Sequence, residues 1–521
     1  MTDVGASAEP LSGPGCGCPE GRRLTLSRRS LFKALGGTAL VGASLGDVQL
    51  AFGASGPRPH VLVTVILPGG MDGLTLVPPL GDPGYAAARP VIAVPASAAM
   101  SVDRMFGLHP ALAPLFPYWH AGTFGVVHAV GQEAPTRSHF EAMDELERAA
   151  PDSALRTGWL DRTLGAIPMT TALEAVALGD GSVPGLLRGE HAKLAANSLQ
   201  DIVLPVDTDV TPTATWRKVF ATLHAGARPE VLTPLKTLVD VVDTLHKLPD
   251  PNQPPPPPPA PPKPTKPTPK PSASTPPAVA AATRSASATA SASGSPSATV
   301  SGSAMAKSMR TAAPSASPSE SPSVTPSAPP VVTPVPTPHA AIAVPKTPPQ
   351  YPGGGFGDGL RDIARLIKAD VGLRLASVSR GGWDYHTNIG PVDGGQGSMA
   401  GDLNELATGL AAFAADLGPH YDRVTVVTLT EFGRRVEQNG NNGLDHGHGC
   451  VTLLLGGGIQ GGRVHGTWPT LAPSRLDQGD LAATTDYRLI LAEILTRQMG
   501  VGSVTDVFPG LPAKTLGVVR A

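Results

Sequence analysis

A long segment rich in proline, serine, alanine and threonine divides the chain, and it is the strongest constraint on the fold. It runs from about residue 249 to about residue 350, opens with the unbroken run Pro254–Pro259 and contains almost no large apolar residues. Such a segment cannot bury enough surface to offset the entropy that it would lose on ordering. We therefore expect a disordered insertion, polyproline-like at first and then flexible.

The stretches on either side, residues 58–248 and 352–521, have a globular composition. Short apolar runs rich in β-branched residues predict strands buried on both faces, at Val61–Leu67, Phe124–Val130, Val371–Val378, Val424–Leu429 and Val451–Leu455. Between them, apolar residues spaced three and four apart predict helices, at Met399–Leu417 and Asp486–Met499. This alternation predicts an α/β fold with a mainly parallel sheet.

Acidic residues and histidines gather in the loops beside these strands, which is where α/β sheets place their ligand sites. The candidate metal ligands are Asp72, Asp384, His386, Glu431, Asp445 and His446. Carboxylate oxygens and imidazole nitrogens both bind zinc and similar divalent ions. Taken singly, each loop is also compatible with an ordinary turn or with solvated side chains. Their convergence at one sheet edge would favour one or two divalent metals.

The candidate ligands lie on both sides of the proline-rich segment. Asp72 precedes it, whereas Asp384 and Asp445 follow it. A shared site therefore requires the segment to leave and re-enter one sheet, so we expect a single discontinuous domain. The alternative is a linker that separates two independent domains.

A helix is expected to begin at Ser138 and to continue through Arg148. Ser138 and Glu141 have the spacing of a capping box, a purely structural role. A helix N-terminus also favours bound anions, so Ser138 is a candidate nucleophile. Arg137, or alternatively Arg434, is a candidate for holding an anion.

The N-terminus has the order of features of a signal peptide. Ser27-Arg28-Arg29-Ser30-Leu31-Phe32-Lys33 precedes the apolar stretch Ala34–Gly46, and Ala51-Phe52-Gly53 offers small residues for cleavage. The paired arginines predict a twin-arginine signal peptide over residues 1–54, export in folded form by the Tat translocase and an extracytoplasmic mature protein. The stretch is too short for a stable membrane span, which needs ~20 apolar residues. A basic tail followed by an Ala/Gly-rich linker is the alternative.

Net charge and cysteine content bear on nucleic-acid binding and on disulfide formation. The net charge is −2 over 521 residues, which gives no indication of a nucleic-acid partner. Cys16 and Cys18 precede the twin arginines and would be lost on processing. Only Cys450 would remain, so the mature chain is expected to rely on its core, and on metal, rather than on a disulfide.

Several motifs together resemble an exported bacterial family, domain of unknown function 1501. They are the twin arginines, Leu67–Leu74, His128–Gly131, Arg137–Phe140, Thr157–Leu160, Gly382–His386, Glu431–Arg434, Asp445–Gly447 and Gly456–Trp468. They cover nearly the whole chain outside the insertion. That family in turn looks like a distant branch of the alkaline phosphatase and sulfatase superfamily.

The resemblance implies a three-layer α/β/α, alkaline-phosphatase-like fold with a one- or two-metal site. By order along the chain, Ser138 would match the nucleophile, and the metal ligands would be those named above: Asp72, Asp384, His386, Glu431, Asp445 and His446. We therefore expect an exported hydrolase of phosphate or sulfate esters that uses one or two divalent ions such as Zn, Ca, Mg or Mn. Its substrate would be an anionic small-molecule or polymer ester. The alternative is a non-catalytic cell-surface or binding protein on the same fold.

Overall fold

The computed structural model describes residues 40–42, 58–167, 173–202, 222, 241–242, 244–245, 248, 349–390, 392 and 398–520. Nearly all of the predicted insertion (249–350) and of the predicted signal peptide (1–54) lies outside these residues. The described elements, in chain order, are β1 (Leu40–Gly42), β2 (Val61–Ile66), α2 (Gly73–Leu76), α3 (Pro83–Ala88), β3 (Met100–Ser101), β4 (Gly107–Leu108), η1 (Pro110–Leu115), α4 (Phe116–His120), β5 (Phe124–Gly131), α5 (His139–Arg148), α6 (Trp159–Ala166), β6 (Ala175–Leu178), η2 (Gly185–Leu187), β7 (Lys193–Ala196), η3 (Leu199–Asp201), α9 (Gly355–Lys368), β8 (Leu375–Ser379), α10 (Met399–Leu417), η4 (Gly418–Arg423), β9 (Val424–Leu429), β10 (Cys450–Gly456), β11 (Val464–His465), η5 (Pro473–Arg475), β12 (Thr485–Asp486) and α11 (Tyr487–Arg497).

One large sheet organises the described part of the chain. Its strand order is β1-β7-β6-β8-β2-β9-β10-β5-β11, and β12 also pairs with β5. From β7 to β9 the neighbouring strands are parallel, whereas β10 runs antiparallel to both β9 and β5. The mostly parallel sheet confirms the predicted α/β class.

Strands from the two sides of the proline-rich segment pair directly with each other. The central strand β2 hydrogen-bonds in parallel to β8 on one side and to β9 on the other, with Val63 opposite Ala376 and Val426. The two flanking stretches therefore share one sheet, which two independent domains would not do.

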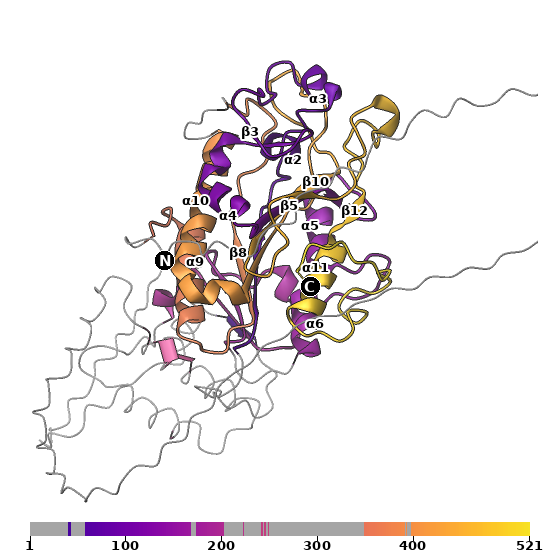
Figure 1. The fold of residues 1–521 in the computed structure, drawn as a ribbon. Helices are drawn as coiled ribbons and strands as arrows, with labels where there is room; N and C mark the ends of the chain where they lie inside the picture. The colour runs from indigo at the N-terminus through magenta and orange to yellow at the C-terminus, as the bar shows by residue number, and fades with distance from the viewer. Residues whose placement is uncertain are drawn as a thin grey trace, which may run out of the picture. The chain divides into compact units, whose positions relative to one another are not determined.

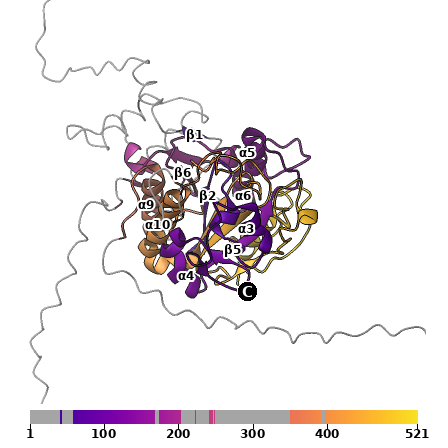
Figure 2. The ribbon, with the colours of Figure 1, turned by 90° about the horizontal axis from the view of Figure 1, so that it is seen from above.

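The sheet lies between two layers of helices. Alternate residues of β2 face two different hydrophobic cores, one on each side of the sheet. Val63 packs in the first core and Leu62 in the second. Helices α4, α9 and α10 lie on one side of the strands, and α5, α6 and α11 on the opposite side (Figures 1 and 2). The apolar stripe predicted for α10 is entirely buried, at Met399, Leu403, Leu406, Leu410, Phe413 and Leu417.

The expected strand at Val371–Val378 begins later than predicted, at Leu375. Gly372 has a positive φ of 90°, and the amides of Arg374 and Leu375 both donate to the carbonyl of Glu174. The chain therefore turns onto the sheet only at Leu375. Among the described residues, no helix combines the length and apolarity needed to span a bilayer.

The sheet brings the candidate loops to one edge. Strands β2, β8 and β9 are parallel, so their carboxyl ends lie together. Because β10 is antiparallel to both β9 and β5, β5 also ends at this edge and β10 begins there. The loops after β2, β5, β8 and β9, and the loop before β10, therefore meet.

Candidate metal centre

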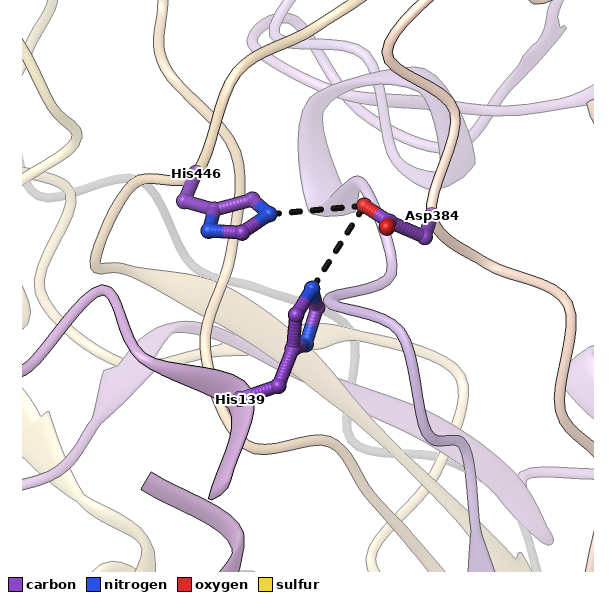
Figure 3. Close-up of side chains that lie close together, drawn as sticks. All are labelled: His139, Asp384 and His446. Atoms are coloured by element: carbon purple, nitrogen blue, oxygen red, sulfur yellow. Dashed lines mark ion pairs between the residues drawn. The ribbon is translucent and has the colours of Figure 1, made fainter. Parts of the chain in front are cut away.

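Three side chains from three loops converge at this sheet edge: His139, Asp384 and His446 (Figure 3). His139 begins α5, Asp384 follows β8, and His446 precedes β10. Asp384 Oδ1 lies 3.5 Å from His139 Nε2 and 3.4 Å from His446 Nε2. One potential ligand atom of each residue lies within 4.8 Å of the other two, which is compact enough to hold a metal ion.

A third histidine adjoins this group. His386 Nε2 lies 3.1 Å from Asp384 Oδ1 and 2.9 Å from His446 Nε2. Around a tetrahedral zinc ion with bonds of ~2.0–2.1 Å, ligand atoms lie about 3.3 Å apart. The spacing of these nitrogens and of the carboxylate oxygen therefore fits one small divalent ion.

The orientation of His139 is set by a buried carboxylate. Its Nδ1 lies 2.7 Å from Glu431 Oε1, and the Glu431 side chain is only 1% exposed. The same oxygen accepts a hydrogen bond from the Gly69 amide at 2.8 Å. A carboxylate at Nδ1 places the ring proton there and leaves the lone pair on Nε2. His139 Nε2 is buried and has no hydrogen-bond partner, although it faces Asp384.

The other two histidines are oriented in the same way. His446 Nδ1 lies 2.7 Å from the backbone carbonyl of Arg137, and His386 Nδ1 lies 3.3 Å from Asp445 Oδ1. Metal-binding histidines typically donate their second ring N–H to such oxygens. With the ring proton on Nδ1, each of the three imidazoles directs an Nε2 lone pair toward the same carboxylate.

Local charges favour an ionised carboxylate and a neutral imidazole. Burial acts to raise the pKa of Asp384, but the hydrogen bond and charge of Arg434 outweigh it, so the pKa is lowered. Burial lowers the pKa of His446, against the opposing effect of its hydrogen bond to Arg137. These are the protonation states that metal ligation requires.

An open pocket of about 610 Å³ leads to the cluster. His139, Asp384 and Glu431 lie among its lining residues, so one side of the cluster faces it. Helix α5 contributes Phe140, which is 90% exposed, to the lining. Arg188 also lines the pocket, and its side chain is 57% exposed.

Comparison with known proteins gives a match to a family model but to no individual protein. Residues 279–496 match the family model described as "Protein of unknown function (DUF1501)". Over this range the chain is similar to the DUF1501 family. No curated protein and no solved structure matches the chain. The matched range includes Asp384, His386 and His446, whereas His139 lies before it.

Asp72 has a different partner, Arg89. Its carboxylate accepts hydrogen bonds from Arg89 Nη1 at 2.5 Å and Nη2 at 2.9 Å, and from the Thr75 amide at 2.8 Å. It thereby caps α2. Both side chains of the ion pair are at most 1% exposed. The structure does not bring Asp72 into the cluster of His139, Asp384 and His446.

The capping box predicted at Ser138 is absent. Ser138 occupies the N-cap position of α5, but its side chain forms no capping hydrogen bond. The hydroxyl of Thr136 instead donates to Glu141 Oε2 at 2.9 Å and accepts from the Ser138 amide at 3.3 Å. Glu141 is thus held by Thr136, and the Ser138 hydroxyl accepts no capping hydrogen bond from the helix amides.

Neither candidate anion-binding arginine is free. Arg137 Nη2 lies 2.5 Å from Asp480 Oδ2, and the Asp480 side chain is 2% exposed. Arg434 is fully buried and lies 2.6 Å from Asp384 Oδ1.

Of the predicted ligands, Asp384, His386 and His446 come together directly, whereas Glu431 and Asp445 orient two of the histidines. His139 was not among the predicted ligands. Its sequence signal was its position after β5, at the start of α5 and at the same sheet edge as the other loops.

Proposed function

We propose that this protein is an exported, metal-dependent hydrolase of phosphate or sulfate esters. The observation that carries the proposal is the shared orientation of His139, His386 and His446. Each directs an Nε2 lone pair at Asp384 Oδ1 while its Nδ1 faces an acceptor oxygen. With the ring protons on Nδ1, the three Nε2 lone pairs and the carboxylate repel one another, and a metal ion between them would relieve this repulsion.

The ligand set favours zinc among the divalent ions considered. Imidazole nitrogens and a single carboxylate suit zinc, whereas calcium and magnesium prefer all-oxygen sites. A divalent ion bound there would act as a Lewis acid on an ester oxygen.

The surrounding residues supply roles for ester hydrolysis. Ser138 immediately precedes His139 at the start of α5, and its hydroxyl does not cap the helix, so we retain it as the nucleophile. We assign the anionic group to Arg188 rather than Arg137. Arg188 lines the pocket, and its 3.6 Å ion pair is with the exposed Asp144, whereas Arg137 is bound to the buried Asp480. The choice of phosphate or sulfate esters rests on the resemblance to the alkaline phosphatase superfamily.

Export is proposed from the twin arginines, Arg28 and Arg29, which lie outside the described residues. Tat transport carries folded proteins, so a metal could be inserted in the cytoplasm before export. A metal cluster and a twin-arginine signal are therefore compatible parts of one proposal.

A non-catalytic role has one observation in its favour. His386 Nε2 lies 2.9 Å from His446 Nε2, next to the group of His139, Asp384 and His446, and a fourth protein ligand there would complete a tetrahedron. Closed sites of this kind are typically structural, whereas catalytic zinc sites keep one position open.

The test is a hydrolysis assay on the purified protein after chelation and after addition of zinc, manganese, magnesium or calcium. Suitable probes are p-nitrophenyl phosphate, bis-p-nitrophenyl phosphate and p-nitrophenyl sulfate. We expect hydrolysis that requires added metal and falls at least about 100-fold in His139→Ala and Asp384→Asn. His420→Ala is the matched control, because His420 lies in η4, before the amino end of β9.

Metal-loaded protein that hydrolyses none of these probes would favour the non-catalytic role. Hydrolysis that survives chelation and the Asp384→Asn substitution would contradict a metal-dependent mechanism altogether.

A further inference from the structure

Arg434 is a buried cation that ties together the loops of the metal cluster. Its Nε donates to the Gly70 carbonyl at 2.6 Å, its Nη1 to Leu444 at 3.0 Å and its Nη2 to Trp383 at 3.2 Å. Nη2 also donates to the carbonyl of Gly69. These acceptors come from the loop after β2, the loop after β8 and the loop before β10. One guanidinium therefore joins three chain segments that are remote in sequence.

The same guanidinium also contacts the central carboxylate. Arg434 Nη2 lies 2.6 Å from Asp384 Oδ1, the oxygen that the three histidine nitrogens surround. The Arg434 side chain is 0% exposed, so water screens its charge little. Asp384 thus has one permanent cationic neighbour before any metal arrives.

The nearby carboxylates carry too little uncompensated negative charge to bind a second divalent ion. Asp72 is neutralised by Arg89 at 2.5 Å. Glu431 accepts from His139 and from a backbone amide. Two divalent ions about 4 Å apart need several anionic ligands between and around them. With Arg434 already present, a second divalent ion would leave positive charge in excess of the three carboxylates Asp384, Glu431 and Asp445, which is unfavourable in a partly buried site.

We propose that Arg434 is a fixed second cation of this site: it positions Asp384 as a ligand and limits the cluster to one divalent metal. The inference rests on the proposed metal site and specifies its metal number. Arg434 is a positioning residue, because it acts on the metal through Asp384 and the three loops.

The test measures zinc stoichiometry and affinity on the full-length chain after chelation. Cys16→Ser and Cys18→Ser are introduced throughout, so that the N-terminal thiols do not bind zinc. We expect one equivalent of zinc by elemental analysis and by titration. Arg434→Gln should weaken zinc binding about 10- to 100-fold, as is typical when a group that orients a metal ligand is lost.

Two further variants distinguish a positioning role of Arg434 from a general destabilisation of the fold. Arg434→Lys keeps the charge but loses the planar fork, so it should also bind zinc at least about tenfold more weakly. It remains informative if Arg434→Gln does not fold. Arg435→Gln is the matched control: its side chain is 37% exposed and donates to the Gln478 carbonyl, so zinc affinity should not change.

Each outcome bears on a different claim. Two equivalents of zinc would overturn this inference and leave the proposed metal-dependent function standing. No bound zinc would overturn both. One equivalent with unchanged affinity in Arg434→Gln and Arg434→Lys would overturn the positioning role.

Discussion

Asp72 offers a direct test of whether an acidic residue at this sheet edge stabilises the fold or binds metal. Asp72 and Arg89 form a two-point ion pair, and their side chains are 1% and 0% exposed. Removing one partner of a buried ion pair leaves the other charge uncompensated and costs about 3–5 kcal/mol. Asp72→Asn keeps the side-chain shape and one acceptor oxygen, so we expect a loss near the lower end, about 3 kcal/mol.

Urea denaturation at pH 7, followed by tryptophan fluorescence, measures this loss as a lower midpoint with an unchanged slope. Zinc affinity should match that of the wild type. Asp144→Asn is the control, because Asp144 is 45% exposed in its pair with Arg148 and should cost less than about 1 kcal/mol. A variant with wild-type stability but weakened zinc binding would refute the reasoning and make Asp72 a ligand.

Three other predictions concern pH, loop packing and the pocket. Burial lowers the pKa of His128 from 6.5 to about 4. The unfolded chain therefore takes up this proton first, and stability falls as the pH drops from 6.5 to 4, by up to about 3 kcal/mol from this group. His128→Gln should lose correspondingly less stability between urea titrations at pH 7 and pH 4, and an equal loss would contradict the assignment. Gly69 has a φ of 115°, and an added Cβ would lie 2.8 Å from the Asp384 amide nitrogen, so Gly69→Ala should weaken zinc binding about tenfold in a chelator competition. Gly418→Ala, with a φ of 51° and open space around it, should leave zinc affinity unchanged. Arg188→Ala should raise the KM for anionic esters about tenfold in steady-state assays with little change in kcat, and an unchanged KM would exclude Arg188 from substrate binding.

Much of the fold could be predicted because burial leaves a local signature. Strands such as β2 and β9 are covered on both faces, so their sequences are continuous apolar runs. Helix α10 packs one stripe against the sheet, and its spacing of three and four residues reveals it. The antiparallel direction of β10 could not be predicted, because direction depends on the path of the connecting loop rather than on the strand sequence.

The candidate site was predictable only in part. Asp384 and His446 could be found because they lie in loops next to recognisable strands. His139 was overlooked because it follows a serine at a helix start, where the cap explains the local pattern without it. The two carboxylates Asp72 and Glu431 look alike in sequence, since each follows a buried strand. Only the fold shows that one faces Arg89 and the other His139.

The roles of the arginines were also beyond the sequence. Arg137 and Arg434 both lie in polar loops, where a guanidinium normally remains in water. In the structure Arg434 is fully buried and Arg137 is bound to Asp480. Burial of a guanidinium depends on acceptors from distant segments, which local sequence patterns do not report.

X-ray absorption spectroscopy of the zinc-loaded protein tests the central claim most directly. With Cys16 and Cys18 replaced by serine, we predict a first shell of nitrogen and oxygen atoms at about 2.0–2.1 Å. The imidazole scattering should correspond to the histidines of the cluster and should fall by one ring in His139→Ala. A spectrum without imidazole scattering, or one that is unchanged in His139→Ala, would contradict the metal centre proposed for this fold.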